Sequence, residues 1–128
     1  MDVNKAILIG RLTNDPVAKK TKLGADIVSC GIATNYVWKD LKTKKLNKVP
    51  EFHNLFFYGN LAPVATKYLK KGDRIYVEGR IRTRKWEDKN KQNHYKTDII
   101  VSSVVMLGGK KAIESAKETA VEEIIVED

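Results

Sequence analysis

The sequence predicts an all-β fold, a five-stranded closed Greek-key barrel with one helix between the third and fourth strands. Three observations lead to this prediction. Short segments alternate apolar and polar residues with the period of a strand, turn-forming residues separate them, and one segment after the third strand has helical spacing. The 128 residues are enough for one domain with a single hydrophobic core. The strand periodicity also allows a β-sandwich, and the position of the helix favours the barrel.

The first two strands lie near the N-terminus. Residues 5–12 (KAILIGRL) are rich in β-forming residues and end at the turn sequence TNDP. The three consecutive apolar residues at 7–9 predict burial on both faces of this strand. Residues 26–38 (DIVSCGIATNYVW) form the second strand, in which Gly31 is expected to mark a bulge or a bend. The side chains of this strand that share the predicted core face are Val28, Cys30, Ile32 and Thr34.

A lysine-rich segment, a third strand and a helix follow. Residues 39–50 have no apolar periodicity and are expected to be an exposed loop or hairpin tip. Residues 51–58 (EFHNLFFY) alternate an aromatic face with a second apolar face and predict a strand. Residues 60–72 predict the helix, with Asn60 as its N-cap and Gly72 at its end. The apolar stripe of this helix consists of Leu61, Val64, Ala65, Tyr68 and Leu69.

The last two strands form a predicted hairpin. Residues 73–86 alternate a core face with a charged face, residues 87–94 are a polar tip, and residues 95–107 are the return strand. If no bulge interrupts the first of these strands, Trp86 lies on the same face as the arginines that precede it. Three strands, one helix and two strands are the order of elements in the oligonucleotide/oligosaccharide-binding (OB) fold.

Basic residues outnumber acidic ones and are unevenly distributed. The chain has 24 Lys and Arg, 16 Asp and Glu, and a formal net charge of +8. Residues 110–128 hold three of the basic and six of the acidic residues, so residues 1–109 hold 21 basic and 10 acidic residues, a charge of +11. The order of elements assigns residues 1–109 to the OB domain, and its charge favours a polyanion as partner, although basic surfaces also occur on proteins without one. Residues 110–128 are expected to be a short acidic tail, disordered or marginally helical.

Four aromatic residues fall outside the predicted core faces and have basic neighbours. Lys39 follows the first of them, and RIRTRK precedes the last. Unpaired bases need such a surface, because every base has a π face that stacks on an aromatic ring and every nucleotide has a phosphate that attracts a cation. The same rings are also compatible with a second core or a subunit interface. The four residues are Trp38, Phe52, Tyr58 and Trp86.

The sequence has no pattern typical of an enzyme or a metal site. Cys30 is the only cysteine and the two histidines, His53 and His94, are far apart, so no metal or cofactor is expected. Nucleophile motifs and phosphate-binding glycine loops are absent from the sequence. No apolar run reaches the ~18 residues of a membrane span, and the first residues do not resemble a signal peptide. We therefore expect a cytoplasmic binding protein that is not an enzyme and has no membrane partner.

The segments VNKAILIGRLTNDP, EFHNLFFYGNLAPVATKYLKKGDRIYVEGRIRTRKW and VVMLGG extend from residue 3 to residue 109. In their order and spacing they resemble the bacterial and mitochondrial single-stranded DNA-binding proteins. The resemblance implies an OB barrel, assembled as a homotetramer, that binds and protects single-stranded DNA in replication, recombination and repair. It implies no cofactor and a location in the cytoplasm, associated with the nucleoid.

The resemblance also assigns roles to individual residues. By local motif, base stacking falls on the four aromatic residues named above. Phe52 stands where the family commonly has tryptophan and Tyr58 where it commonly has phenylalanine, and both retain an aromatic ring. The aromatic-His pair of the family falls on EFH and implies that His53 lies near a subunit interface. The phosphate contacts of the family fall on Arg82, Arg84, Lys85 and Lys71.

The C-terminal end departs from the family pattern. Bacterial members commonly have a long flexible linker rich in Gly, Pro and Gln, and an acidic tip that ends in Pro-Phe and recruits replication and repair proteins. Here the chain ends EEIIVED, which is acidic but has no Pro-Phe. The tail therefore lacks the Pro-Phe anchor with which the family recruits replication and repair proteins.

Two other functions stay open on the sequence alone. One is an RNA-binding or primosomal OB-fold protein, such as a cold-shock-like domain. The other is a structural interaction subunit whose aromatic residues face another protein.

Overall fold

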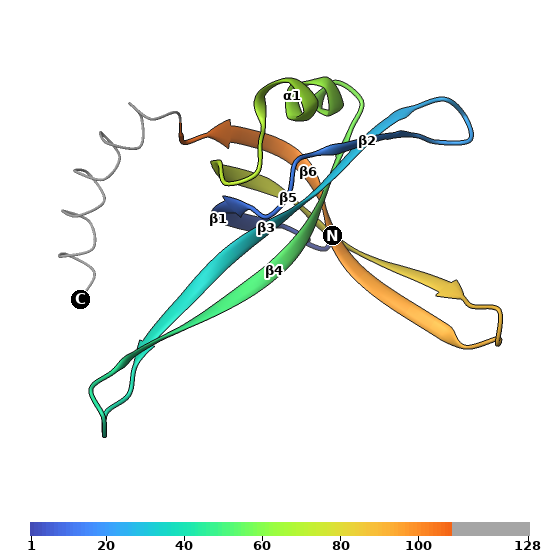
Figure 1. Cartoon of the computed structure of the whole chain (residues 1–128). Coiled ribbons are helices and arrows are strands. Elements are labelled where there is room, and N and C mark those ends of the chain that lie inside the picture. Colours follow the sequence, from blue (N-terminus) through green and yellow to red (C-terminus); the bar gives the residue numbers. More distant parts are fainter. Residues whose placement is uncertain (109–128) are drawn as a thin grey trace.

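The computed structural model describes residues 1–108 as one β-barrel with one helix (Figure 1). The acidic tail predicted over residues 110–128 lies outside the described residues and stays a prediction. Within residues 1–108, no helix is long and apolar enough to cross a membrane. The elements are β1 (Ala6–Leu12), β2 (Val17–Lys20), β3 (Asp26–Lys39), β4 (Leu46–Tyr58), α1 (Leu61–Tyr68), β5 (Arg74–Glu87) and β6 (Asn93–Met106).

The strands form one sheet in the order β1-β5-β6-β4-β3-β2, and a further pairing between β1 and β3 closes five of them into a barrel. The pair β4–β6 is parallel and the other pairs are antiparallel. A closed five-stranded barrel with a helix between β4 and β5 is the OB fold, so this prediction is confirmed. The sixth strand, β2, pairs along β3 outside the barrel and was not predicted, because all four of its residues are exposed.

The core lies inside the barrel and beneath α1. In β3 the predicted alternation is confirmed, with Val28, Cys30 and Ile32 buried. The side chains that fill the barrel come from every one of its strands, so closure of the barrel and burial of the core are the same event. The buried residues are Leu12, Val28, Cys30, Ile32, Leu55, Phe57, Ala62, Ala65, Leu69, Ile75, Val77, Ile99 and Val101.

Burial of Cys30 has a chemical consequence that can be tested. Burial raises the pKa of its thiol to about 12, because the apolar surroundings disfavour the charged thiolate. The thiolate is the reactive form, so we expect the native protein not to react with a disulfide reagent such as DTNB at pH 8. One thiol per chain should react once the protein is unfolded in guanidinium chloride. Rapid modification of the native protein would contradict the burial of this residue.

The prediction that β1 is buried on both faces is wrong. Ile7 and Ile9 are 56% and 47% exposed, while Leu8 between them packs against the core. A strand of a closed barrel has one face inside and one outside, and among residues 1–108 nothing covers the outer face of β1. The outer face therefore keeps two apolar side chains in contact with solvent.

Of the bulge or bend predicted at Gly31, the bulge is not found there and a bulge lies elsewhere. The β3–β4 pairing runs without a shift through Gly31, and a Cβ on Gly31 would lie 2.4 Å from Thr13 Oγ1. The position thus requires glycine for close approach to the segment after β1. The register shift is instead in the β5–β6 pairing at Glu78/Gly79, where β6 has the extra residue. Because the extra residue is in β6, the alternation of β5 continues without interruption.

The helix is shorter than predicted. It covers Leu61–Tyr68, and Asn60 precedes it without a side-chain capping hydrogen bond. Its core contacts are made by Ala62 and Ala65, and Leu69 follows them into the core from the residue after the helix. The chain then turns at Gly72, whose φ of +91° lies in the region that favours glycine.

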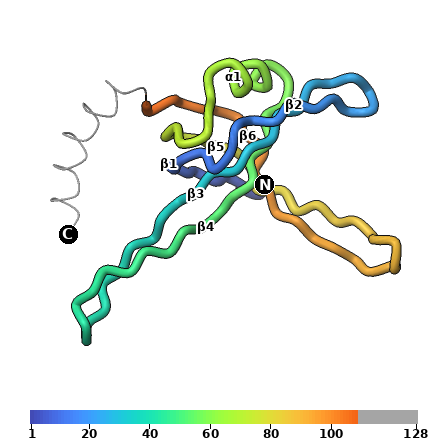
Figure 2. Tube along the Cα trace, viewed as in Figure 1, coloured from blue at the N-terminus to red at the C-terminus, as the bar shows by residue number. Residues whose placement is uncertain are grey.

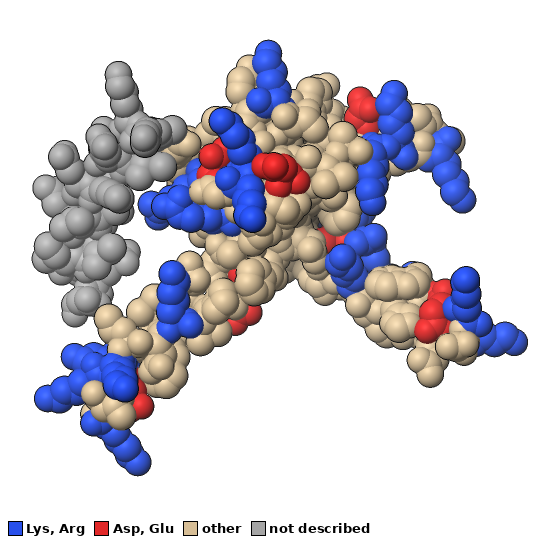
Figure 3. All heavy atoms as spheres, viewed as in Figure 1, with Lys and Arg blue, Asp and Glu red and all other residues tan. Residues whose placement is uncertain are grey.

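Three hairpins extend from the barrel as arms (Figures 1 and 2). We name them the β2–β3 arm (residues 17–29), the β3–β4 arm (residues 35–50) and the β5–β6 arm (residues 83–97). The two segments predicted as loop or tip do hold hairpin tips, at residues 40–45 and 88–92, but the strands extend farther into both segments than predicted, to Lys39 and Leu46 in the first of them. Lysine and arginine side chains gather at the ends of all three arms (Figure 3).

Candidate nucleic-acid interface

Two arginines and one buried aspartate form a cluster at the base of the β5–β6 arm. Arg82 Nε donates to Asp98 Oδ1 at 3.0 Å, and Arg84 Nε donates to Asp98 Oδ2 at 2.6 Å. Arg82 also donates from Nη1 to the hydroxyl oxygen of Tyr58 at 2.9 Å. Burial by itself would lower the pKa of Arg82, but the hydrogen bonds with Asp98 and Tyr58 raise it above its usual value overall. The cluster therefore keeps a net positive charge.

The guanidinium groups of this cluster lie over aromatic rings of β4. The Arg84 guanidinium carbon is 4.9 Å from the centre of the Phe56 ring, and that of Arg82 is 5.2 Å from the same centre. Phe56 and Tyr58 stack with their ring centres 6.3 Å apart. Cations over ring faces attract the π electrons and hold the arginines in place. The result is a surface in which aromatic rings and positive charge are in direct contact.

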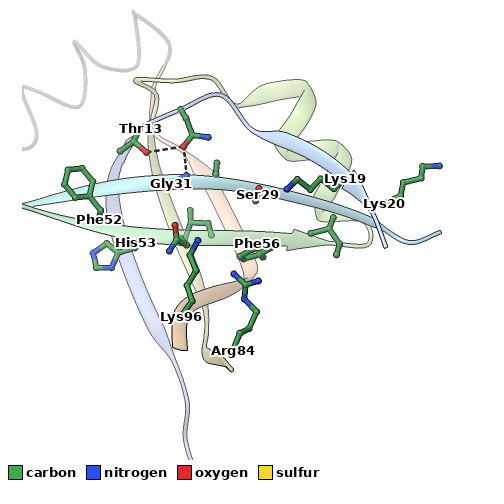
Figure 4. A pocket seen from close by; sticks show the side chains of 15 residues that line it. Thr13, Lys19, Lys20, Ser29, Gly31, Phe52, His53, Phe56, Arg84 and Lys96 are labelled. Atoms are coloured by element: carbon green, nitrogen blue, oxygen red, sulfur yellow. Dashed lines mark hydrogen bonds between the residues drawn. The ribbon is translucent and has the colours of Figure 1, made fainter. Parts of the chain in front are cut away.

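This surface opens into a groove of about 570 Å³ across β3 and β4 (Figure 4). In Figure 4, Arg84 and Lys96 approach it from the β4 side, and Lys19 and Lys20 lie toward the β3 side. Arg84 and Lys96 are cross-strand partners in the β5–β6 pairing, which brings their charges together. Cations from three strands thus line one groove, an arrangement suited to a phosphate chain. The remaining lining residues are Thr13, Asn14, Ile27, Ser29, Cys30, Gly31, Phe52, His53, Asn54, Leu55 and Phe56.

Sequence reasoning missed part of this groove. Lys19 and Lys20 were missed with the strand β2 that holds them. Lys96 could have been predicted from the register of the β5–β6 hairpin, in which it pairs with Arg84. Asp98 could have been noticed because it directly precedes the apolar run IIV in a predicted strand. An aspartate is rarely buried unless it is paired, so its position there indicates a paired cation.

The β5–β6 arm presents Trp86, which is 46% exposed. One face of its ring stacks on His94, with ring centres 5.5 Å apart and an interplanar angle of 21°. His94 Nε2 lies 2.7 Å from Asp88 Oδ2, so the histidine is anchored in turn. Trp86 is two positions after Arg84, and the uninterrupted alternation of β5 confirms that they share a face. Trp86 therefore continues the surface of the arginine cluster along the arm.

The other predicted aromatic residues do not form one platform with Trp86. Phe52 is 70% exposed and lies at one end of the groove. Its cross-strand partner is Ala33, and Trp38 is five residues farther along β3, so Trp38 lies on the opposite face of the β3–β4 arm. Trp38 is 43% exposed. The aromatic residues are thus distributed over both faces of this arm and along the β5–β6 arm.

Two of the predicted phosphate contacts lie away from the arginine cluster. Lys85 follows Arg84 and therefore points to the opposite face of β5, where its ammonium is 5.8 Å from the ring centre of its cross-strand partner Tyr95. Lys71 lies in the turn after α1, and its backbone N–H donates to Asp15 Oδ1 at 2.8 Å. The predicted cations are consequently spread over at least three places on the surface.

His53 faces the barrel side of β4 and is partly buried. One of its ring nitrogens, Nε2, is 2.9 Å from Thr34 Oγ1 on the neighbouring strand. It also lines a second groove of about 380 Å³ with Ala6, Leu8 and Ile81. Residues 1–108 contain no group of three or more His, Cys, Asp or Glu that could hold a metal ion. The histidine is thus a hydrogen-bonded residue at the edge of the barrel.

A separate surface, on the outer faces of β1, the first half of β5 and the end of β6, combines exposed apolar side chains with charged ones. Ile9 pairs with Tyr76, and Tyr76 pairs with Val105. Lys5 Nζ lies 3.4 Å from Glu78 Oε2, and the Tyr76 hydroxyl donates to Glu78. The hydrogen bond with Glu78 raises the pKa of Tyr76, and the same bond lowers the pKa of Glu78. This face therefore has an ordered polar pair beside exposed apolar side chains.

The chain was compared with known protein families and solved structures. The model of the single-strand binding protein family matches residues 3–107, and this family is a non-catalytic DNA-binding family. A Plasmodium falciparum SSB in complex with ssDNA is 34% identical with a TM-score of 0.75, and the match covers 84% of this chain and 97% of that one. A deletion mutant of the single-stranded DNA-binding protein from Thermus aquaticus is 28% identical with a TM-score of 0.71. That match covers 84% of this chain and 52% of the Thermus chain, so the present chain spans about half of its length.

Proposed function

This chain belongs to the single-strand binding protein family, and from this premise we propose that it binds single-stranded DNA without sequence preference. The groove with its aromatic floor and cations from three strands is the observation that carries the proposal. Single strands expose bases and phosphates together, and a duplex hides its bases from such a surface. We further propose that this binding protects DNA strands in replication, recombination and repair.

The decisive experiment compares the affinity of the protein for single-stranded DNA, duplex DNA and RNA of equal length at two salt concentrations. We expect the tightest binding to single-stranded DNA and a marked loss of affinity for every ligand as salt rises. Tighter binding to RNA would favour an RNA-binding or primosomal protein. Absence of binding to all three would favour a structural interaction subunit whose aromatic residues face protein.

Base stacking is proposed for Trp38, Phe52, Tyr58 and Trp86. Exposure supports this role for both tryptophans and for Phe52, since a base must reach the face of the ring. Tyr58 is partly buried and its hydroxyl is held by Arg82, so its ring is fixed beside the groove. Because the residues occupy different faces and arms, the strand must wrap around the protein to contact all of them.

Phosphate binding is proposed for Arg82, Arg84, Lys85 and Lys71, together with the groove lysines of β2 and β6. Replacing Arg84 with alanine is expected to lower the slope of log affinity against log salt concentration by ~0.7, because one condensed counterion fewer is released from a single strand. Fluorescence titrations with poly(dT) at several salt concentrations measure this slope. Lys85→Ala and Lys71→Ala are expected to lower it by similar amounts if their phosphate contacts form.

The control for this series is Lys67→Ala. Lys67 lies in the last turn of α1, away from the groove, and its removal changes the net charge by the same amount. Its slope should stay close to that of the unchanged protein. An Arg84→Ala protein that binds more weakly by the same factor at every salt concentration would instead indicate a packing role for Arg84.

A homotetramer is proposed as the assembled form. The exposed apolar side chains of Ile7, Ile9 and Val105 on the outer face of β1, β5 and β6 support it, because contiguous apolar surface is typical of an interface. His53, at the edge of the barrel, is proposed to lie near a second contact between subunits. Ile9→Glu is expected to dissociate the assembly, as measured by sedimentation equilibrium. A monomeric unchanged protein would contradict the proposal.

The protein is proposed to act without catalysis and without a metal or cofactor, in the cytoplasm and associated with the nucleoid. Recruitment of replication or repair proteins by the acidic tail would involve residues outside those the structure describes.

A further inference from the structure

Asp98 is an acid at the centre of a basic surface. It is the one buried charged residue among residues 1–108, and its side chain is fully enclosed. Both of its carboxylate oxygens are used, one by Arg82 and one by Arg84. A buried carboxylate is costly unless it is paired, and two arginines are more than the pairing of one charge requires. The arrangement therefore points to a role beyond neutralising a buried charge.

The geometry of the hydrogen bonds shows what the carboxylate does to the arginines. Each arginine uses its Nε on Asp98, which leaves the two Nη groups on the other end of the guanidinium plane. Arg82 uses Nη1 on Tyr58, whereas the side chain of Arg84 is 40% exposed and lines the groove. Asp98 at one edge of the guanidinium and Phe56 against its face thus restrain Arg84 on two sides, at the border of the groove that it lines.

We propose that Asp98 is a positioning residue for single-stranded DNA, which holds Arg84 in the groove so that a phosphate meets an already oriented guanidinium beside Lys96. The inference rests on the proposed function and deepens it. Arginine side chains have many rotamers, and ordering them upon binding reduces affinity. A carboxylate that orders them beforehand, in the folded protein, removes that cost from the binding step.

The inference makes a prediction whose sign is opposite to that of simple electrostatics. Asp98 is negative, so its Coulomb interaction with a phosphate in the groove is repulsive. If charge alone mattered, Asp98→Asn would add one positive charge and tighten binding at low salt. If Asp98 acts by positioning, the same substitution releases Arg82 and Arg84 and weakens binding despite the added charge.

The test measures the affinity of Asp98→Asn for poly(dT) at low and high salt, beside the unchanged protein. We expect affinity at low salt to fall about fivefold. Circular dichroism and a thermal melt show whether the barrel is intact. The matched control is Glu87→Gln, which adds the same charge on the same arm at an exposed residue and is expected to leave affinity unchanged or raise it.

Two further variants connect the effect to Arg84. In an Asp98→Asn background, Arg84→Ala should reduce affinity by a smaller factor than it does alone, since the arginine is already misplaced. Arg84→Lys keeps the charge but has a single ammonium, which cannot contact Asp98 and the groove through separate nitrogens. We expect it to weaken binding nearly as much as Arg84→Ala. This variant tests the inference without Asp98→Asn, should that protein not fold.

The outcomes are distinct. An Asp98→Asn protein that is folded and binds as tightly as the unchanged protein, or more tightly, overturns the positioning role. Independent, multiplicative effects of Asp98→Asn and Arg84→Ala overturn it as well, and so does full binding by Arg84→Lys. In each of these cases the unchanged protein still binds, and the proposed function stands. If the unchanged protein does not bind single strands, the proposed function fails and the inference fails with it.

Discussion

Replacing Trp86 with alanine is expected to weaken binding to long poly(dT) by ~1–3 kcal/mol, the range for loss of one stacked base. The barrel should stay folded, because Trp86 lies on the β5–β6 arm and is 46% exposed. The measurement is a fluorescence titration, in which the unchanged protein should show quenching of its tryptophan emission as bases stack on Trp38 and Trp86. The Trp86→Ala protein should retain the smaller part of the quenching that comes from Trp38.

The stack between Trp86 and His94 sharpens this expectation. His94 covers one face of the indole, so a base stacks on the other face or displaces the imidazole. Trp86→Phe is the control, because it keeps a ring between the base and His94, and it should restore most of the affinity. A Trp86→Ala protein that binds poly(dT) with unchanged affinity would show that this ring does not stack on bases.

Phe57→Ala is expected to lower the free energy of unfolding by ~3–5 kcal/mol, the largest effect of any prediction made for this protein. Phe57 is fully buried and is the largest completely enclosed side chain among residues 1–108. Removing its ring loses the transfer free energy of the apolar atoms and leaves a cavity that a closed barrel cannot easily collapse. Urea denaturation followed by circular dichroism, at one fixed protein concentration, measures the change.

Phe52→Ala is the matched comparison for this prediction. It is the same substitution on the same strand, but Phe52 lies on the outer face of β4 and is 70% exposed. Its effect on the free energy of unfolding should stay within about 0.5 kcal/mol, while its affinity for poly(dT) should fall. Equal destabilisation by the two substitutions would contradict the assignment of the two faces of β4.

The alternation of β4 and β5 was predictable because it is a local property of a strand. Residues two apart share a face wherever the backbone is extended, so FHNLFFY and RIRTRKW predicted which side chains lie together before any fold was known. The arginines and Trp86 do share a face of β5, as expected. The buried row of β3 was found in the same way.

Pairing between distant strands was not predictable in this way. The β2 strand has no buried residue, so hydrophobic alternation could not reveal it; its backbone pairs with β3 all the same. The lysine-rich segment at 39–50 is polar, yet part of it is strand, because ladder hydrogen bonds extend the hairpin beyond the core. Ile7 and Ile9 show the opposite case, in which apolar residues predicted to be buried are exposed. An apolar run predicts burial, but it does not distinguish burial inside the barrel from burial against another molecule.

The sequence by itself determined the OB fold class, the buried rows of the strands, the aromatic residues among basic neighbours and the family resemblance. These are set by local periodicity and by residue types at fixed spacing. Only the tertiary structure decided which cations share the groove, that Trp38 and Phe52 lie on opposite faces of one arm, and that Asp98 is buried between two arginines. The physical reason is that a groove and a buried ion pair depend on distances between strands remote in sequence, and those distances exist once the barrel has closed.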